Sequence, residues 1–288
     1  MTNKLKTLVL FSLLTGLFLA IGGALGGREG LFIAFIMAMV MNFFSYWCSD
    51  SIVLKMYRAQ ELSESDAPAL HKIIAELAYN AGLPKPRLYI VPDDSPNAFA
   101  TGRDPEHAVI AVTQGILKLL DTNELRGVLA HEMSHIANRD ILIQSCAAVL
   151  GTAITYLANM LYYASLFGGG SRNDDNRGGI GGALGGVAMM ILAPLAATLI
   201  RMAISRSREF LADETGARIS GSPLSLASAL TKLEAYSRRL PLRNANPSTE
   251  GMFIVTPLTG GGIQNLFRTH PTTEERVERL KAIAAGAH

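Results

Sequence analysis

The sequence predicts an α+β, multi-pass membrane protein, in which four transmembrane helices accompany a domain built from a small antiparallel sheet and several helices. Composition is the first of two observations behind this prediction. Of the 288 residues, 49% are hydrophobic and 17% are charged, and the mean hydropathy is +0.25, as is typical of membrane proteins. The second observation is a set of uncharged apolar runs, each near or above the ~20 residues that span a bilayer. They cover residues 7–27, 31–49, 141–170 and 178–200.

The first two runs are expected to be retained anchors that make up residues 1–49. A cleaved signal peptide is the alternative for the first run, since Lys4 and Lys6 precede it and small residues at 20–24 lie near its end. That run, however, continues through Gly-Gly-Ala-Leu-Gly-Gly without a polar cleavage region. The second run begins directly after Arg28-Glu29-Gly30, which predicts a tight hairpin between two spans.

Lysine and arginine predict which side of the membrane each segment occupies, because short cytoplasmic segments carry an excess of these residues. If the chain crosses four times, one side receives Arg28 and a Gly-rich loop at 171–179, where two arginines are offset by two aspartates. The other side receives the remaining flanking cations, which are Lys4, Lys6, Lys55, Arg58, Arg201, Arg206 and Arg208. We therefore expect the N-terminus, both soluble segments and the C-terminus to be cytoplasmic.

Two soluble segments, residues 50–140 and 205–288, total about 175 residues, enough for one hydrophobic core. We expect them to form a single domain, interrupted by a transmembrane hairpin at 141–204. The first segment begins with an apolar stripe at helical spacing between Pro68 and Gly82, and continues with β-type runs separated by turn residues. These runs, at 87–91, 97–100 and 108–112, predict the small antiparallel sheet.

Residues 131–135 read His-Glu-Met-Ser-His, within a stretch whose apolar residues recur at helical spacing. Asp121, three residues before a glutamate, predicts the start of this helix as a capping box. Positions i and i+4 share one helix face, so His131 and His135 can aim ring nitrogens at one metal. Glu132 can then reach the water on that metal. A surface helix with two solvated histidines is the alternative, but this pattern is typical of zinc hydrolases.

A catalytic zinc site usually takes a third protein ligand and leaves the fourth position to water. The best candidates are Glu209 and Asp213, which lie four apart on a predicted helix that runs to about Gly221. One carboxylate could bind zinc while the other accepts the free N–H of a ligating histidine; a solvated acidic face is the alternative. If His135 and Glu209 bind one metal, the chain between them must cross the membrane an even number of times. Two apolar runs lie between them.

Other functional signals are weak. The formal net charge of +2 is no sign of nucleic-acid binding. The two cysteines, Cys48 and Cys146, lie within or beside apolar runs and have neither metal-ligand spacing nor a disulfide pattern. We expect both to be small buried hydrophobes.

The zinc motifs together resemble those of a known family. Glu209-x-x-x-Asp213 downstream of His131-Glu132-x-x-His135 is similar to the gluzincin arrangement. Two apolar runs precede these motifs, two lie between them, and Leu266-Phe267-Arg268-Thr269-His270-Pro271 follows, so the chain resembles the HtpX-type membrane metalloproteases over essentially its whole length. The resemblance implies a cytoplasmic zincin-like metalloprotease domain. It also implies that His131, His135 and Glu209 bind one Zn²⁺, while Asp213 holds His131 in its productive tautomer.

Further roles are implied by the same resemblance. Asn97-Ala98-Phe99-Ala100 is similar to the edge strand on which gluzincin peptidases bind an extended substrate, although an ordinary sheet strand is the alternative. His270, which precedes a proline, would stabilise the developing oxyanion, and Arg276 would brace the site. A surface histidine at the start of a helix is the alternative for His270.

The resemblance implies a zinc metalloendopeptidase in which Glu132 is the general base. Its substrates would be misfolded or damaged membrane proteins, cleaved at the cytoplasmic face of the bacterial inner membrane. The expected partners are therefore polypeptides and the lipid bilayer, without nucleic acid. One alternative is a processing protease of narrow specificity, related to the CAAX prenyl proteases, which have more spans. Another is a non-catalytic scaffold with a structural zinc, but such a site has no use for the Glu132 carboxylate.

Overall fold

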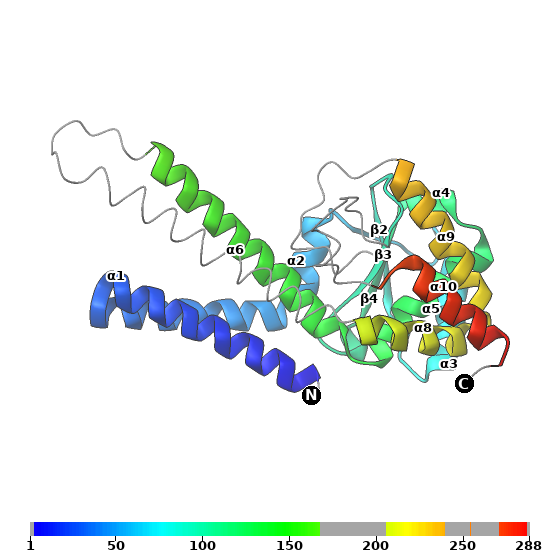
Figure 1. The fold of residues 1–288 in the computed structure, drawn as a ribbon, viewed down its shortest axis with the longest axis horizontal. Helices are drawn as coiled ribbons and strands as arrows, with labels where there is room; N and C mark the ends of the chain where they lie inside the picture. The colour runs from blue at the N-terminus through cyan, green and yellow to red at the C-terminus, as the bar shows by residue number, and fades with distance from the viewer. Residues whose placement is uncertain (1–2, 168–205, 240–253, 255–270, 287–288) are drawn as a thin grey trace.

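The computed structural model describes residues 3–167, 206–239, 254 and 271–286. Within these ranges the chain is mostly helical with one small sheet, which confirms the predicted α+β class (Figure 1). The helices are α1 (Asn3–Trp47), α2 (Ser49–Met56), α3 (Pro68–Ala81), α4 (Gln114–Leu119), α5 (Thr122–Ala137), α6 (Ile141–Phe167), α8 (Arg206–Ser220), α9 (Pro223–Arg239) and α10 (Thr273–Ala284), with a short 3₁₀ turn at Pro105–His107. The strands are β1 (Gln60–Glu61), β2 (Arg87–Val91), β3 (Ala98–Thr101) and β4 (Val109–Thr113).

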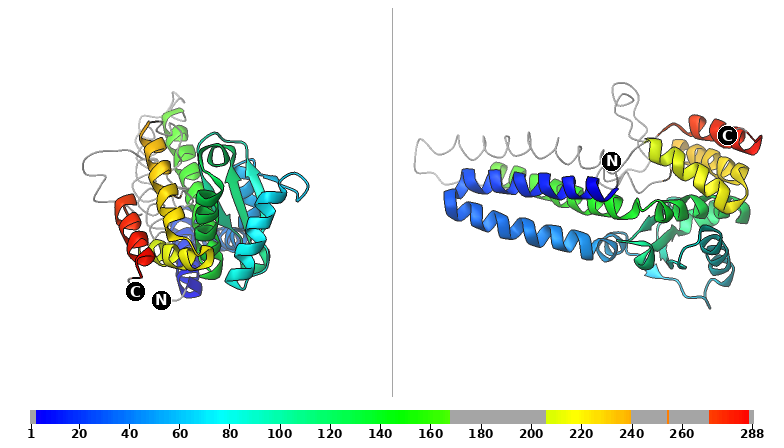
Figure 2. Two further views of the ribbon diagram at one scale, coloured as in Figure 1. Left: turned by 90° about the vertical axis from the view of Figure 1, so that its right-hand side faces the viewer. Right: turned by 90° about the horizontal axis from the view of Figure 1, so that it is seen from below.

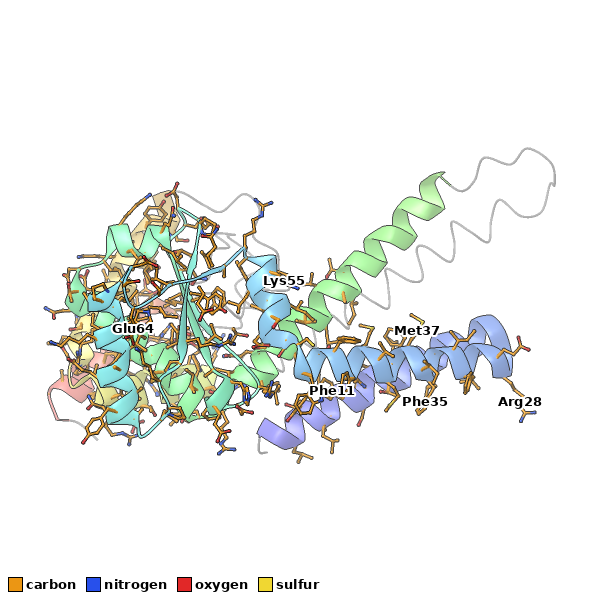
Figure 3. All side chains as sticks on the ribbon, turned by 180° about the vertical axis from the view of Figure 1, so that it is seen from behind. Phe11, Arg28, Phe35, Met37, Lys55 and Glu64 are labelled. Carbon is orange, nitrogen blue, oxygen red and sulfur yellow. The ribbon has the colours of Figure 1, made fainter. Side chains whose placement is uncertain are left out.

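α1 is a hairpin of two apolar helical halves. Gly26 and Gly27 interrupt it with non-helical backbone angles, and Gly27 has a φ of 54°, a left-handed conformation that glycine adopts at little cost. The turn therefore lies just before the predicted one, because Arg28-Glu29-Gly30 already belongs to the second helical half. Figure 3 shows Arg28 at the far tip of the hairpin, away from the globular part of the molecule.

Within the described residues, one helix is long and apolar enough to cross a membrane: Gly26–Trp47, with a mean hydropathy of 1.7. Two shorter apolar helices, Thr7–Ala20 and Ile141–Thr155, lie inside the first and third predicted spans. The fourth predicted span, at 178–200, lies outside the described residues. Length and composition thus support the second span, and the four-span topology stays a prediction.

The two halves of α1 differ in what covers them. Figure 3 shows Phe35 and Met37 projecting from the second half, and these side chains are 45% and 51% exposed. The first half instead packs against α6 through a buried apolar cluster, which consists of Leu10, Leu14, Cys146, Leu150 and Ile154. Cys146 is therefore a buried hydrophobe, as predicted, whereas Cys48 is only partly buried.

The four strands form a mixed sheet of order β1-β2-β4-β3, so the prediction of an antiparallel sheet is wrong. β2 and β4 run parallel, and β3 pairs antiparallel with β4 at the edge of the sheet. The loop between β2 and β3 includes Pro92 and Pro96 and does not impose a tight hairpin, so β4 can lie between β2 and β3. Every residue of β4 is buried, as is typical of a central strand.

One hydrophobic core contains residues from both sides of the 141–204 segment. α5 lies at its centre, with α3 and the sheet on one side and α8 and α9 on the other (Figure 2). α5 packs closely on α9 at Gly127, where an added Cβ would lie 2.6 Å from the backbone nitrogen of Leu226. Residues that share this core include Leu77, Ile110, Leu129, Ala217, Leu230 and Leu280.

Candidate metal centre

α5 begins with the capping box that the sequence predicts. The Asp121 carboxylate accepts from the backbone N–H of Glu124 at 3.0 Å, and the Glu124 carboxylate accepts from that of Asp121, also at 3.0 Å. Glu124 further accepts from Ser228 at 2.7 Å and from Lys232 at 2.6 Å, both on α9. Burial acts to raise the pKa of Glu124, but these hydrogen bonds outweigh it and hold the pKa below its ordinary value. The start of α5 is therefore anchored to α9.

Side chains from α5 and α8 bring three potential metal ligands together. The Nε2 atoms of His131 and His135 lie 3.3 Å apart. One oxygen of Glu209 lies 3.6 Å from the His131 Nε2, and the other lies 3.9 Å from the His135 Nε2. All three side chains are buried. Tetrahedral zinc with bonds of about 2.0–2.1 Å separates its ligand atoms by roughly 3.3 Å, so two imidazoles and a carboxylate at this spacing fit one zinc ion.

The packing of α8 on α5 brings Glu209 to the two histidines. Gly216 of α8 lies against the backbone of His131, and an added Cβ at this position would be 3.0 Å from the His131 Cα. Glycine permits this approach, since a side chain would push the helices apart. Glu209 lies on the same helix, two turns before Gly216 and therefore on the same face.

Asp213 and Arg276 hold the ring of His131. Asp213 Oδ1 lies 3.0 Å from His131 Nδ1, and Arg276 donates to both oxygens of Asp213, at 2.6 and 2.8 Å. Burial acts to raise the pKa of Asp213, but Arg276 outweighs it and keeps this pKa below its ordinary value. Burial and Arg276 act to lower the pKa of His131, yet Asp213 and Glu209 raise it to about 9.

Arg276 reaches this site from α10 and is 2% exposed. Its helix begins with a second capping box, in which the Thr272 hydroxyl accepts from the Glu275 backbone and the Glu275 carboxylate accepts from the Thr272 backbone. Arg276 also donates to the carbonyl of Ile254 at 2.9 Å. His270 lies outside the described residues.

Glu132 lies beside the ligands and is buried. Its carboxylate accepts the backbone N–H of Ala100, in β3, at 2.9 Å. Burial raises the pKa of Glu132, which brings it closer to the range in which a carboxylate both takes and returns a proton efficiently.

The predicted substrate segment Asn97-Ala98-Phe99-Ala100 overlaps β3, which pairs with β4 alone in the described part of the chain. Asn97 accepts from the backbone N–H of Thr113 at 2.9 Å. Hydrogen-bonded and non-bonded pairs alternate in an antiparallel ladder, so Ala98 and Ala100 direct their main-chain groups away from β4. The bond from Ala100 to Glu132 agrees with this register.

The side chains of the same segment are buried. Phe99 packs on the ring of Tyr57, with the ring centroids 4.9 Å apart. The Asn97 side chain accepts from the backbone N–H of Ile254 at 3.3 Å. The segment is therefore an edge strand in the described sheet whose side chains contribute to packing.

Two buried residues near the ligands have no counterpart in the sequence prediction. Asp140 Oδ2 lies 3.3 Å from His135 Nδ1, and Asp140 Oδ1 lies 3.8 Å from Arg208 Nη1. The only available sequence signal was a carboxylate five residues after the second motif histidine, directly before the third apolar run.

Comparisons with known proteins bear on this arrangement. The model of peptidase family M48 matches residues 64–284. The protease HtpX homolog of Persephonella marina is 56% identical over 285 residues, covering 98% of this chain and 98% of the relative. That of Pyrococcus furiosus is 57% identical over 279 residues, covering 97% of this chain and 95% of the relative.

A solved structure shares the fold. The crystal structure of S. mikatae Ste24p aligns with a TM-score of 0.52 at 19% identity, over 96% of this chain. The chain spans 65% of the length of that protein. The full-length identity to HtpX homologs and the M48 match carry the assignment: the chain belongs to peptidase family M48, among the HtpX-type membrane metalloproteases.

Proposed function

We propose that the chain is a zinc-dependent endopeptidase that hydrolyses misfolded or damaged membrane proteins at the cytoplasmic face of the membrane. The observation that carries the proposal is the convergence of His131, His135 and Glu209, with ligand atoms 3.3 to 3.9 Å apart and Glu132 buried beside them. A structural zinc site, in contrast, usually has four protein ligands and needs no general base beside them.

The chemistry follows from the roles of these side chains. Zinc held by these ligands would lower the pKa of a bound water toward neutrality and would polarise the scissile carbonyl. Glu132 takes a proton from the attacking water and returns it to the leaving amine. Asp213 accepts the Nδ1–H of His131 and so keeps Nε2 free to bind the metal. His270 donates a hydrogen bond to the developing oxyanion.

The substrate binds as an added strand along the outer edge of β3, at Asn97-Ala98-Phe99-Ala100. This part of the proposal is supported by the register of β3, which turns the main chain of Ala98 and Ala100 away from β4. Main-chain recognition tolerates many side chains, which suits substrates that share only an unfolded backbone. The bond from the Ala100 N–H to Glu132 supports a substrate path that ends beside the proposed general base.

The membrane arrangement completes the proposal. Residues 1–49 and 141–204 form four transmembrane helices, and residues 50–140 and 205–288 form one cytoplasmic protease domain. Figure 3 supports this orientation, since Lys55 lies near the globular part while Arg28 lies at the far tip of α1. α5 ends at Ala137 and α6 begins at Ile141, so a short connection keeps the metal site close to the membrane surface, where it meets membrane-protein loops.

A processing protease of narrow specificity, related to the CAAX prenyl proteases, is the second candidate. The structural similarity to Ste24p gives this candidate limited support, because it shows that the fold also occurs outside the HtpX homologs. Substrate range separates the two: a quality-control protease cleaves several unrelated unfolded membrane proteins, and a processing protease cleaves one.

The direct test measures zinc content and casein cleavage together, for the wild type and the Glu132→Gln variant in detergent. We expect one zinc per chain in both and a turnover lowered by about 10²–10⁴-fold in the variant. Glu278→Gln, at an exposed position of α10, is the matched control and should behave as the wild type. Normal cleavage by Glu132→Gln would overturn the assignment of the base. Zinc without wild-type turnover would favour a scaffold.

A further inference from the structure

Asp140 lies where the chain leaves α5 and enters α6, and it is 1% exposed. Arg139, just before it, has a φ of 58°, a left-handed conformation that is uncommon for a residue other than glycine. This turn brings Asp140 back toward α5. The Asp140 backbone N–H donates to the carbonyl of His135 at 2.9 Å, and its carboxylate lies 3.3 Å from the Nδ1 of the same residue.

These two contacts hold both the main chain and the ring of His135. The His135 Nε2 lies on the side of the other ligand atoms, so the proton of the neutral ring belongs on Nδ1 and needs an acceptor there. Asp140 Oδ2 is the acceptor within reach. The arrangement parallels that of His131, whose Nδ1 lies 3.0 Å from Asp213.

Arg208 is a cation near the buried Asp140, although it lies farther from this carboxylate than Arg276 lies from Asp213. Arg208 Nη1 lies 3.8 Å from Asp140 Oδ1, and Arg208 is 7% exposed. It directly precedes the third ligand, Glu209, on α8. The pair therefore lies between the end of the motif helix and the helix that carries the third ligand. A buried carboxylate without a compensating cation would be strongly unfavourable.

We infer that Asp140 is a positioning residue for the metal site, which fixes the ring and tautomer of His135, with the cation of Arg208 nearby. The inference rests on the proposed function, because it assumes that His135 binds the metal. An alternative is that Asp140 only closes the turn between α5 and α6. That role acts through the backbone and predicts lower stability without a change in metal binding.

The test compares Asp140→Ala and Asp140→Asn with the wild type, as purified full-length chains stripped of metal. Zinc affinity is measured by competition with a chelator, and ligand geometry by the visible absorption of Co²⁺ bound in place of zinc. We expect Asp140→Ala to weaken zinc binding by about 10–100-fold and to alter the Co²⁺ spectrum. Asp140→Asn should lose less zinc affinity than Asp140→Ala, since its amide oxygen can still accept the Nδ1–H of His135. The exposed Asp94 provides the control Asp94→Asn, which should match the wild type.

Each outcome is informative. Zinc affinity within about threefold of the wild type for Asp140→Ala, with an unchanged Co²⁺ spectrum, would overturn the inference and leave the proposed function intact. If Asp140→Ala fails to fold, Asp140→Leu, which is closer in size to aspartate and also lacks an acceptor, carries the same comparison, with its metal-free thermal midpoint as the check on folding. A wild type that binds no zinc would overturn the proposed function itself.

Discussion

Replacing Arg276 by leucine removes the cation that compensates a buried carboxylate. Arg276 and Asp213 are 2% and 1% exposed, and two hydrogen bonds of 2.6 and 2.8 Å join them. The leucine has a similar stem but no donor, so Asp213 keeps only His131 as a partner among the contacts described above. The carbonyl of Ile254 also loses its donor.

The size of the effect follows from the geometry. Removing one partner of a buried pair costs about 3–5 kcal/mol, because the remaining charge stays buried without compensation. A thermal midpoint falls by about 2–4 °C per kcal/mol in a chain of this size. The expected loss is therefore about 6–20 °C for the metal-free protein in detergent.

The assay is thermal unfolding of the metal-free protein, with Arg279→Leu as the matched control on the same helix. Arg279 is exposed and lies 3.8 Å from the centroid of the Phe210 ring, a contact worth about 0.5–1 kcal/mol. The double variant Arg276→Leu with Asp213→Asn should be more stable than Arg276→Leu alone, because it no longer buries an unpaired charge. A loss for Arg276→Leu no larger than that of the control would refute the reasoning.

Two further predictions concern the packing of α5 on α9. Glu124→Gln should lower stability by about 1–3 kcal/mol at pH 7, because the hydrogen bonds from Lys232 favour a carboxylate. The pKa of Glu124 in the folded protein lies below its ordinary value of 4.5. The carboxylate therefore contributes its full stabilisation above that pH, and this stabilisation is lost as the pH falls through the folded pKa. A stability difference between wild type and variant, measured by urea unfolding, that does not shrink below pH 4.5 would contradict this. Gly127→Ala should destabilise by about 1–3 kcal/mol, since its Cβ would meet the Leu226 backbone at 2.6 Å. Gly16→Ala is the control and should not destabilise the protein, because a Cβ added there meets nothing within 4 Å. Equal thermal midpoints for the two variants would show that α5 and α9 separate easily.

Elements with local chemical signals could be predicted from the sequence. The capping box at Asp121 begins α5 as expected, and α3 ends before Gly82, which has a φ of 65°. The helix carrying Glu209 ends before Gly221, whose φ is 69°. β2 matches its predicted run, residues 87–91. In each case a few neighbouring residues determine the backbone through capping or left-handed glycine.

Features that depend on distant contacts could not be predicted in the same way. The parallel pairing of β2 with β4 depends on which strand occupies the centre of the sheet, and alternating patterns do not contain that information. The uninterrupted apolar run in β4 was the available clue. The break in α1 falls at Gly27 rather than at the charged residues that follow, because backbone freedom determines the turn.

In the metal centre, too, local features could be predicted and contacts between distant residues could not. The i and i+4 spacing of His131 and His135 is local and predicts a shared face. The approach of Asp213 and Arg276 to His131 depends on the packing of three helices. The spacing of Glu209 and Asp213 suggested that one of the two carboxylates approaches a ligating histidine, and the resemblance to known proteases indicated which one, together with Arg276. Asp140 shares no motif with the ligands, and its position depends on the left-handed turn at Arg139.

X-ray absorption at the zinc K-edge of the purified chain tests the central claim most directly. If His131, His135 and Glu209 bind one zinc, the spectrum should show nitrogen and oxygen ligands alone at about 2.0–2.1 Å, with imidazole scattering from two rings. Glu209→Ala should leave both imidazole contributions in place and lower the affinity for zinc. Sulfur scattering at about 2.3 Å, or fewer than two imidazoles, would contradict the account.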